Sequence, residues 1–486
     1  MTPLLAALSP CVLHGCKAGP DMTSPDLAAQ TPATWLSDMT PTDGVDDITR
    51  WWSHLEDPEL SGLIERALLG SLSLAEARER IVGARARRGI TNADRLPSLD
   101  LSASYERAQT GDEGFVLGGA PAGSDVDIYS LGVVAGWEID LWGRVSRLVE
   151  AADADIAFAI EDFRAARVAL AAEVAREVVA IRALDQDIEL VTASIEADRD
   201  ALAIARARAD AGFGDELDAA RAARVLDANR AAIPALRADR RDAELRLAVL
   251  IGARPGEADV ASRSLPRRDI LPGLGVPADL LMRRPDLRRA EREFAAATAR
   301  IGAEQAAALP RFSLSGAVAL QGPDAGDMIN PDAYILSAGP SISLPIFDGA
   351  RIASRVDQAE SDQRRALLRL RAATLAAFAE VETASMRRAR AEERAALLVD
   401  AERSADDAEA LALDRYTSGT VDFLDVTEAR SRRLVIERDR TRAERDAILR
   451  LIDLYTALGG GWDDGSQALV PESPEPSASA PSSTAS

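Results

Sequence analysis

The chain has 486 residues, 47% of them hydrophobic and only 4% aromatic, and a formal net charge of −22 at pH 7. This acidity argues against nucleic acid as a partner, because nucleic-acid-binding proteins carry basic patches. The only histidines are His14 and His54, and both cysteines, Cys11 and Cys16, lie near the N-terminus. His/Cys metal sites, Cys–His nucleophile pairs and, with Lys17 as the only lysine, Walker A loops are therefore missing. We expect no enzyme, no metal and no cofactor.

A short apolar leader ends in Leu13-His14-Gly15-Cys16. A small residue before a cysteine at the end of such a run is typical of a lipoprotein cleavage site. We therefore expect a signal peptide at residues 1–15, lipidation of Cys16, and a lipid-anchored extended segment over residues 16–50. The alternative is a soluble leader with an incidental cysteine, because no Lys or Arg precedes the apolar run and His14 is unusual there.

A first structural repeat is predicted at residues 51–255. It opens with helix signals, among them Pro58 at a helix start and a helix from Ser73 to Ala93. Two stretches, 99–105 and 129–139, then alternate apolar residues with small or polar ones. That period of two is typical of a half-buried strand, and it also fits a membrane barrel with lipid outside and water within.

The longest pattern follows these strands. From Arg144 to Ala211 there are 68 residues without Gly or Pro. At ~1.5 Å per residue they predict a helix of roughly 100 Å, far longer than the mean globular helix. Gly212 and Gly214 mark a turn, after which a second helix returns. Helices of this length are expected to cross a distance rather than to wrap a core.

The second half of the chain repeats the first. Gly212 and Gly419 lie 207 positions apart (419 − 212), and so do Arg144 and Arg351 (351 − 144). A repeat of this length indicates duplication of a whole structural half. We therefore expect a linker at residues 256–275, a second repeat at 276–462, and a disordered Ser/Pro/Ala tail at 463–486.

The predicted fold class is mainly α with a small β part of four strands. No run of ~18 apolar residues occurs, so no transmembrane helix is expected, which leaves a soluble chain, a lipid anchor or a β-barrel. Four strands cannot close into a barrel, and an open sheet edge cannot lie in lipid. If these strands span a membrane, several chains must share one barrel.

Five motifs cover nearly everything from Cys16 to Trp462: Cys16-x-x-Gly19-Pro20-Asp21, Leu280-Leu-x-Arg-Arg-Pro-Asp-x-Arg-x-Ala-Glu291, Ile301-Gly302-Ala303 with Leu309-Pro310, Tyr416-x-x-Gly419 with Phe423-Leu-Asp425, and Leu458-Gly-Gly-Gly-Trp462. In this order they resemble the TolC/OprM-like outer-membrane factors. The resemblance is to the lipoprotein, NodT-like branch that serves RND-type tripartite efflux systems.

The resemblance implies a homotrimer that shares one outer-membrane β-barrel, four strands from each chain, continued by an α-barrel tunnel of long helices in the periplasm. It implies a lipid-anchored, passive channel that works with a periplasmic adaptor and an RND-type inner-membrane pump, gated at its periplasmic tips. Acidic residues that line the closed tip in such proteins match Asp425 and Glu428. A Tyr–Asp contact between hairpins matches Tyr416 and Asp218, whereas an Arg of the family is replaced by Val421.

Each site has a plainer alternative. Asp425 and Glu428 share a helix face, so three copies would stack acidic rings that favour cations, but such acids are also common at solvated helix starts. The glycines at 212, 214 and 419 provide turn conformations, and as hairpin tips they would also be contact points for an adaptor. The alternative for the whole chain is a periplasmic coiled-coil structural or adaptor lipoprotein that does not span the membrane.

Overall fold

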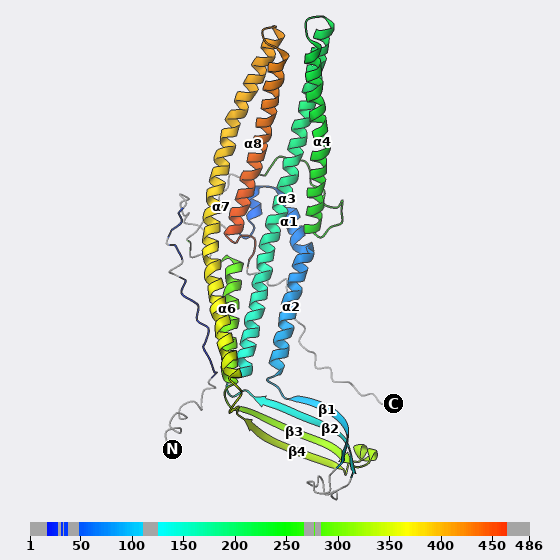
Figure 1. Cartoon of the computed structure of the whole chain (residues 1–486), viewed down its shortest axis with the longest axis vertical. Helices are drawn as coiled ribbons and strands as arrows, with labels where there is room; N and C mark the ends of the chain where they lie inside the picture. The colour runs from blue at the N-terminus through cyan, green and yellow to red at the C-terminus, as the bar shows by residue number, and fades with distance from the viewer. Residues whose placement is uncertain are drawn as a thin grey trace. The chain divides into compact units, whose positions relative to one another are not determined.

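The computed structural model describes residues 17–27, 31–32, 34–36, 48–109, 125–266, 277 and 283–463 (Figure 1). Cys11, Cys16 and the predicted tail beyond residue 463 lie outside the described residues. Within them the elements follow in the order η2 Trp51–Leu55, α1 Pro58–Gly70, α2 Leu72–Ala93, β1 Ser98–Gln109, β2 Asp125–Ile139, α3 Arg144–Asp210, α4 Glu216–Leu250, α6 Pro285–Ala306, β3 Arg311–Gly322, η3 Ala325–Ile329, β4 Tyr334–Ser343, α7 Arg351–Thr417 and α8 Phe423–Ala457.

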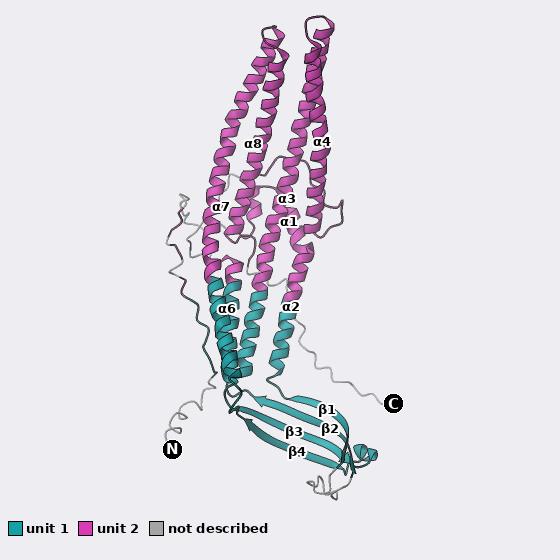
Figure 2. Ribbon diagram, viewed as in Figure 1, with its two compact units in different colours: residues 1–25, 81–159, 289–370 teal, residues 26–80, 160–288, 371–486 magenta. Residues whose placement is uncertain are grey.

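The chain divides into two compact units, and each unit takes segments from both sequence repeats (Figure 2). Unit 1 comprises the described residues up to Pro25 together with Ile81–Ala159 and Arg289–Leu370. Unit 2 comprises the described residues of Asp26–Arg80, Ile160–Arg288 and Arg371–Ser486. None of the described helices is apolar enough over a sufficient length to cross a membrane.

The sheet of unit 1 has four antiparallel strands in the order β1-β2-β3-β4. Directly paired residues lie on the same face of a sheet, so the register extends one apolar row from strand to strand. Leu101 pairs with Val133, Val133 with Val318, and Val318 with Leu336, and all four side chains are exposed. The adjacent row of the first three strands holds small residues: Ser102, Gly132 and Ala319. The predicted strand pattern is therefore confirmed.

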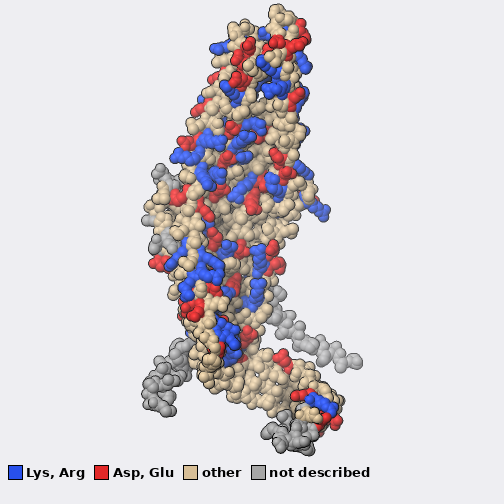
Figure 3. All heavy atoms as spheres, in the orientation of Figure 1, with Lys and Arg blue, Asp and Glu red and all other residues tan. Residues whose placement is uncertain are grey.

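Charge is distributed differently over the two kinds of element. On the face shown in Figure 3, most of the sheet carries no charged side chain, whereas the helices carry both signs. Among the described residues, β1 and β4 each pair with one neighbour only, so both outer edges of the sheet keep unpaired backbone groups. A sheet with two open edges and an exposed apolar face is incomplete as a single chain.

The two helical hairpins have helices of equal length, which is consistent with the predicted repeat. Helices α3 and α7 each have 67 residues, and α4 and α8 each have 35. The starts of α4 and α8, Glu216 and Phe423, lie 207 positions apart (423 − 216), as do those of α3 and α7. The second return helix begins at Phe423, after Asp422 at its N-cap. The loop after β3 contains a short helical turn, η3.

In unit 2, the Gly-Gly-Gly-Trp motif closes the second repeat. The backbone N–H of Gly461, which has a φ of +105°, donates to the carbonyl of Ile48 (3.0 Å). The ring of Trp462 lies under the guanidinium groups of Arg164 (4.6 Å to the ring centroid) and Arg288 (5.1 Å). The glycines permit a close backbone path, and the Trp provides a cation–π platform. This accounts physically for the motif.

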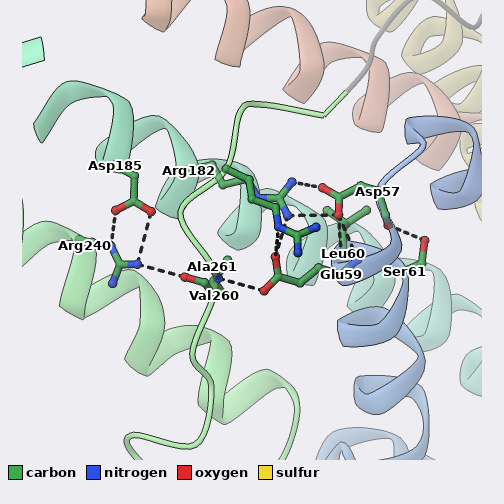
Figure 4. Close-up of polar contacts among 10 residues, drawn as sticks. Asp57, Glu59, Leu60, Ser61, Arg182, Asp185, Arg240, Val260 and Ala261 are labelled. Carbon is green, nitrogen blue, oxygen red and sulfur yellow. Dashed lines mark hydrogen bonds and ion pairs between the residues drawn. The ribbon is translucent and has the colours of Figure 1, made fainter. Parts of the chain in front are cut away.

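The segment after α4, also in unit 2, is held by buried charges (Figure 4). Arg182 of α3 forms ion pairs with Asp57 and Glu59 at the start of α1. Glu59 also accepts a hydrogen bond from the backbone N–H of Ala261 (2.9 Å). Arg240 of α4 donates a hydrogen bond to the carbonyl of Val260 (3.1 Å). Part of the predicted linker is thus fixed to α1 and α4 by side chains distant in sequence.

The N-terminal segment of unit 1 is fixed in a similar way. Arg147, whose side chain is buried, donates to the carbonyl of Ala18 (3.0 Å) and to the carboxylate of Asp21 (2.7 Å). A Cβ on Gly19 would lie 2.3 Å from the Cα of Gly302, so no larger residue fits there. The extended segment that follows the predicted lipidation site is therefore fastened to α3 and α6.

Candidate gate at the hairpin tips

The three predicted turn glycines lie at the two hairpin turns of unit 2. Gly212 and Gly419 have φ angles of +73° and +75°, and no atom lies within 4 Å of a Cβ placed on either. Glycine is needed at these two positions for its backbone conformation and not for space, because residues with a side chain rarely adopt a positive φ. Gly214 is needed for space instead, since its Cβ would lie 3.1 Å from the Cβ of Arg208.

Tyr416 lies inside an apolar cluster that all four long helices build near the turns. This tip cluster consists of Val191, Ile195, Ala201, Leu202, Ala205, Ala222, Leu226, Leu236, Tyr416, Phe423 and Val426. The ring of Tyr416 is 5.3 Å from that of Phe423, centroid to centroid. The cluster joins the α3/α4 hairpin to the α7/α8 hairpin by apolar contact.

Arg208, which the sequence analysis missed, adds a polar link at the same place. Its guanidinium lies 4.5 Å from the centroid of the Tyr416 ring, and its Nη1 donates to the Tyr416 carbonyl (3.2 Å). Burial raises the pKa of the Tyr416 hydroxyl, an effect that Arg208 opposes and Asp218 reinforces. The sequence does show a basic residue, Arg208, in the last turn of α3. It does not show that this residue contacts Tyr416, which lies far away in the sequence.

Asp218 lies in the first turn of α4, and its carboxylate is 3.6 Å from Arg221. Its charge reaches Tyr416, yet among the described residues no hydrogen bond joins the Tyr416 hydroxyl to this carboxylate. Val421, the residue predicted to replace an Arg of the family, packs partly buried against the tip cluster. The Tyr–Asp contact thus remains a prediction for these two neighbouring residues.

Asp425 and Glu428 are exposed on the first turns of α8. Glu428 forms an ion pair with the exposed Arg432, and no described cation pairs with Asp425. Three converging copies would bring these carboxylates together, whereas in one chain they resemble any solvated helix start. Their role as an acidic ring remains a prediction. No cluster of metal-ligating side chains occurs among the residues described.

Comparison with known proteins identifies the family. The family model described as "Outer membrane efflux protein" matches residues 63–253 and 276–460, which is most of both repeats. The chain belongs to this family. Its members are passive outer-membrane channels rather than enzymes; they extend into the periplasm and work as trimers with a periplasmic adaptor and an inner-membrane pump. The resemblance to outer-membrane efflux channels and the prediction that the chain is not an enzyme are both confirmed.

Similar proteins match over nearly their whole length. The pyoverdine export outer membrane protein OpmQ of Pseudomonas aeruginosa is 30% identical over 477 residues, 96% of this chain and 98% of OpmQ. Nodulation protein T of Rhizobium leguminosarum bv. trifolii is 28% identical, with 94% and 97% covered. The structure of the outer-membrane channel OprN matches with a TM-score of 0.83 at 32% identity, over 92% of this chain and 100% of that one.

Proposed function

We propose that three copies of this chain form the lipid-anchored outer-membrane channel of an RND-type tripartite efflux system. The observation that carries the proposal is the sheet of unit 1, with its exposed apolar face and its two open edges. Backbone groups at such edges have no hydrogen-bonding partner in lipid. Joining β1 of one copy to β4 of the next satisfies them and closes a barrel of the chain's own strands.

The long helices support the same assembly. Helix α7 exposes seven large apolar side chains, and four of those in unit 2 recur at spacings of 11, 11 and 14 residues: Leu375, Met386, Leu397 and Leu411. At ~3.6 residues per turn these spacings return to nearly the same side of the helix. An apolar stripe on an otherwise charged helix favours contact with another protein surface. A neighbouring copy that already shares the sheet would provide that surface.

Lipidation of Cys16 is supported by the fixed path of the residues after it. Arg147 and the close approach of Gly19 to Gly302 hold the described residues that follow Cys16 in unit 1, which also contains the sheet. An acyl group on Cys16 and the apolar face of the strands would then enter the same membrane. Asp425 and Glu428 would line the closed periplasmic end and favour cations.

The proposal is tested by mass measurement and by conductance. Protein extracted from membranes with detergent should have the native mass of a trimer. After denaturation, each chain should have the mass of a sequence that starts at Cys16 and carries a diacylglycerol. In planar bilayers the trimer should conduct ions. A folded monomer that leaves the membrane without detergent once its lipid is cut would instead identify a coiled-coil adaptor lipoprotein, and an unmodified chain would contradict the anchor alone.

A further inference from the structure

Unit 2 contains a cavity of about 520 Å³ that is lined by residues of α3, α7 and α8 and by Arg284, which directly precedes α6. This volume lies in the range of roughly 300–1,000 Å³ that is usual for sites of small organic molecules. Four of the lining residues are alanines: Ala376, Ala379 and Ala384 of α7 and Ala457 of α8. Part of the wall is therefore apolar and made by short side chains, which leaves room for a guest molecule.

Both acidic residues that line the cavity are already paired with arginines. Asp453 of α8 accepts a hydrogen bond from Arg176 of α3 (2.9 Å) and, through its other carboxylate oxygen, one from Arg450 (2.9 Å). Glu380 of α7 accepts one from Arg284 (2.7 Å), whose side chain is only 9% exposed. The guanidinium groups of this wall thus hold carboxylates, and the charges of both lining acids are compensated.

A third arginine, Arg387 of α7, also lines the cavity. Several arginines of α7 pair with an acid three or four positions away, as Arg390 does with Glu393 (2.7 Å). The residues at these distances from Arg387 are Thr383, Ala384, Arg390 and Ala391, none of them acidic. Within the part of the chain that the structure describes, no ion pair or hydrogen bond involves the Arg387 side chain. The cavity therefore has a guanidinium group available for an anion.

The cavity lies on the side of α7 that faces away from the N-terminal segment. At about 100° per residue, the α7 residues that line the cavity share one face of the helix, and Phe378 and Glu382 lie on roughly the opposite face. Trp35 meets the Phe378 ring edge-on (6.2 Å between centroids), and the backbone N–H of Leu36 donates to Glu382 (2.5 Å). The N-terminal segment thus covers the face opposite to the cavity.

The direction of the cavity follows from this arrangement. A segment that follows a lipid anchor in the membrane around the barrel runs along the outside of the tunnel, so the opposite face of α7 is turned toward the tunnel interior. Leu375 and Met386 of the apolar stripe each precede a cavity residue by one position and are turned about 100° from it. A neighbouring copy that binds the stripe can therefore leave the cavity open.

We propose that this cavity is a binding site in the tunnel wall for an organic carboxylate with an apolar body. Arg387 pairs with the carboxylate of the guest, and the lining alanines contact its apolar part. The inference rests on the proposed channel function and names a class of compound that the channel carries. Each chain of the trimer contributes one such site, so that the cargo binds along the wall on its way through the tunnel.

The test compares two probes that differ in charge, 2-naphthoate and the uncharged 2-naphthamide, on the detergent-solubilised trimer. Native mass measurement should show one naphthoate per chain. In calorimetric titration the naphthoate should bind about tenfold more tightly than the amide, because only the carboxylate forms a charge-assisted hydrogen bond with Arg387.

Two variants separate the charge from the space. Arg387→Gln should remove the preference for the naphthoate, whereas Arg390→Gln, at an exposed arginine that does not line the cavity, should keep it. Ala379→Leu fills part of the cavity from an exposed position, so it should weaken binding of both probes at least about tenfold. Ala396→Leu, at an exposed alanine of α7 away from the cavity, is its control and should change neither affinity.

Single-channel recording in planar bilayers tests the position of the site. Added 2-naphthoate should cause brief interruptions of the current through the wild-type trimer, and these should shorten in Arg387→Gln. A wild type that never conducts contradicts the proposed function itself. A conducting wild type that binds both probes equally, or whose preference survives Arg387→Gln, overturns the carboxylate site. Naphthoate binding that leaves the current unchanged overturns its place in the tunnel wall.

Discussion

At the scale of single residues, the two repeats place different residues at the turn that precedes the first long helix of each hairpin. Gly143 precedes α3 with a φ of +76°, and the residue 207 positions later, Ala350, precedes α7 with a φ of +66° (350 − 143). An L-residue in the left-handed region is strained by about 1–2 kcal/mol, whereas Gly is not. The second repeat therefore keeps a strained residue where the first has a relaxed one.

Ala350→Gly should stabilise the protein. Relief of the strain exceeds the roughly 0.4–1 kcal/mol that Gly costs by loosening the unfolded chain, so a net gain of up to about 1 kcal/mol is expected. The thermal midpoint of the detergent-solubilised trimer should rise. Gly143→Ala is the matched control and should lower it, because its Cβ would also lie 2.9 Å from the Lys17 side chain. A lower thermal midpoint for Ala350→Gly would show that the backbone conformation of Ala350 does not destabilise the protein.

At the scale of elements, much of the structure could be predicted from periodicity. The long runs free of Gly and Pro predict α3 and α7 to within one residue at their C-terminal ends, because nothing in them interrupts a helix. The alternating stretches predict the strands, since an exposed apolar face needs period two. What the sequence does not show is pairing between distant helices. Arg208 with Tyr416 and Asp198 with Arg430 meet only because the hairpins fold together.

The apolar face of the sheet gives a prediction for β3. Leu314 belongs to that face, and Ser313, its neighbour in the strand, faces the other way. Leu314→Arg should destabilise the channel in lipid vesicles by about 2–4 kcal/mol if the side chain meets the centre of the membrane. Ser313→Arg should cost far less. Urea unfolding of both variants in vesicles measures the difference, and equal losses would show that the two faces do not differ in lipid contact.

At the scale of the whole molecule, the acidic ring exists only if three chains converge. Asp425→Ala combined with Glu428→Ala should reduce cation selectivity in bilayer recordings while changing thermal stability little, since both side chains are exposed. Removing two exposed acids of α7, Asp400 and Asp407, is the control for lost charge alone and should leave selectivity intact. Equal effects in the two double variants would mean that the acids at the turn are ordinary solvated residues.

The equal lengths of the duplicated hairpins have a consequence for symmetry. Three chains, each with two hairpins whose helices match in length, give six rods of similar length in a ring of threefold symmetry. The two turns differ in chemistry, because the first exposes Phe213 and the second has Thr420 at the matching position. A partner ring would therefore meet an alternating series of aromatic and hydroxyl tips. Its own symmetry would decide whether it binds all six or every second one.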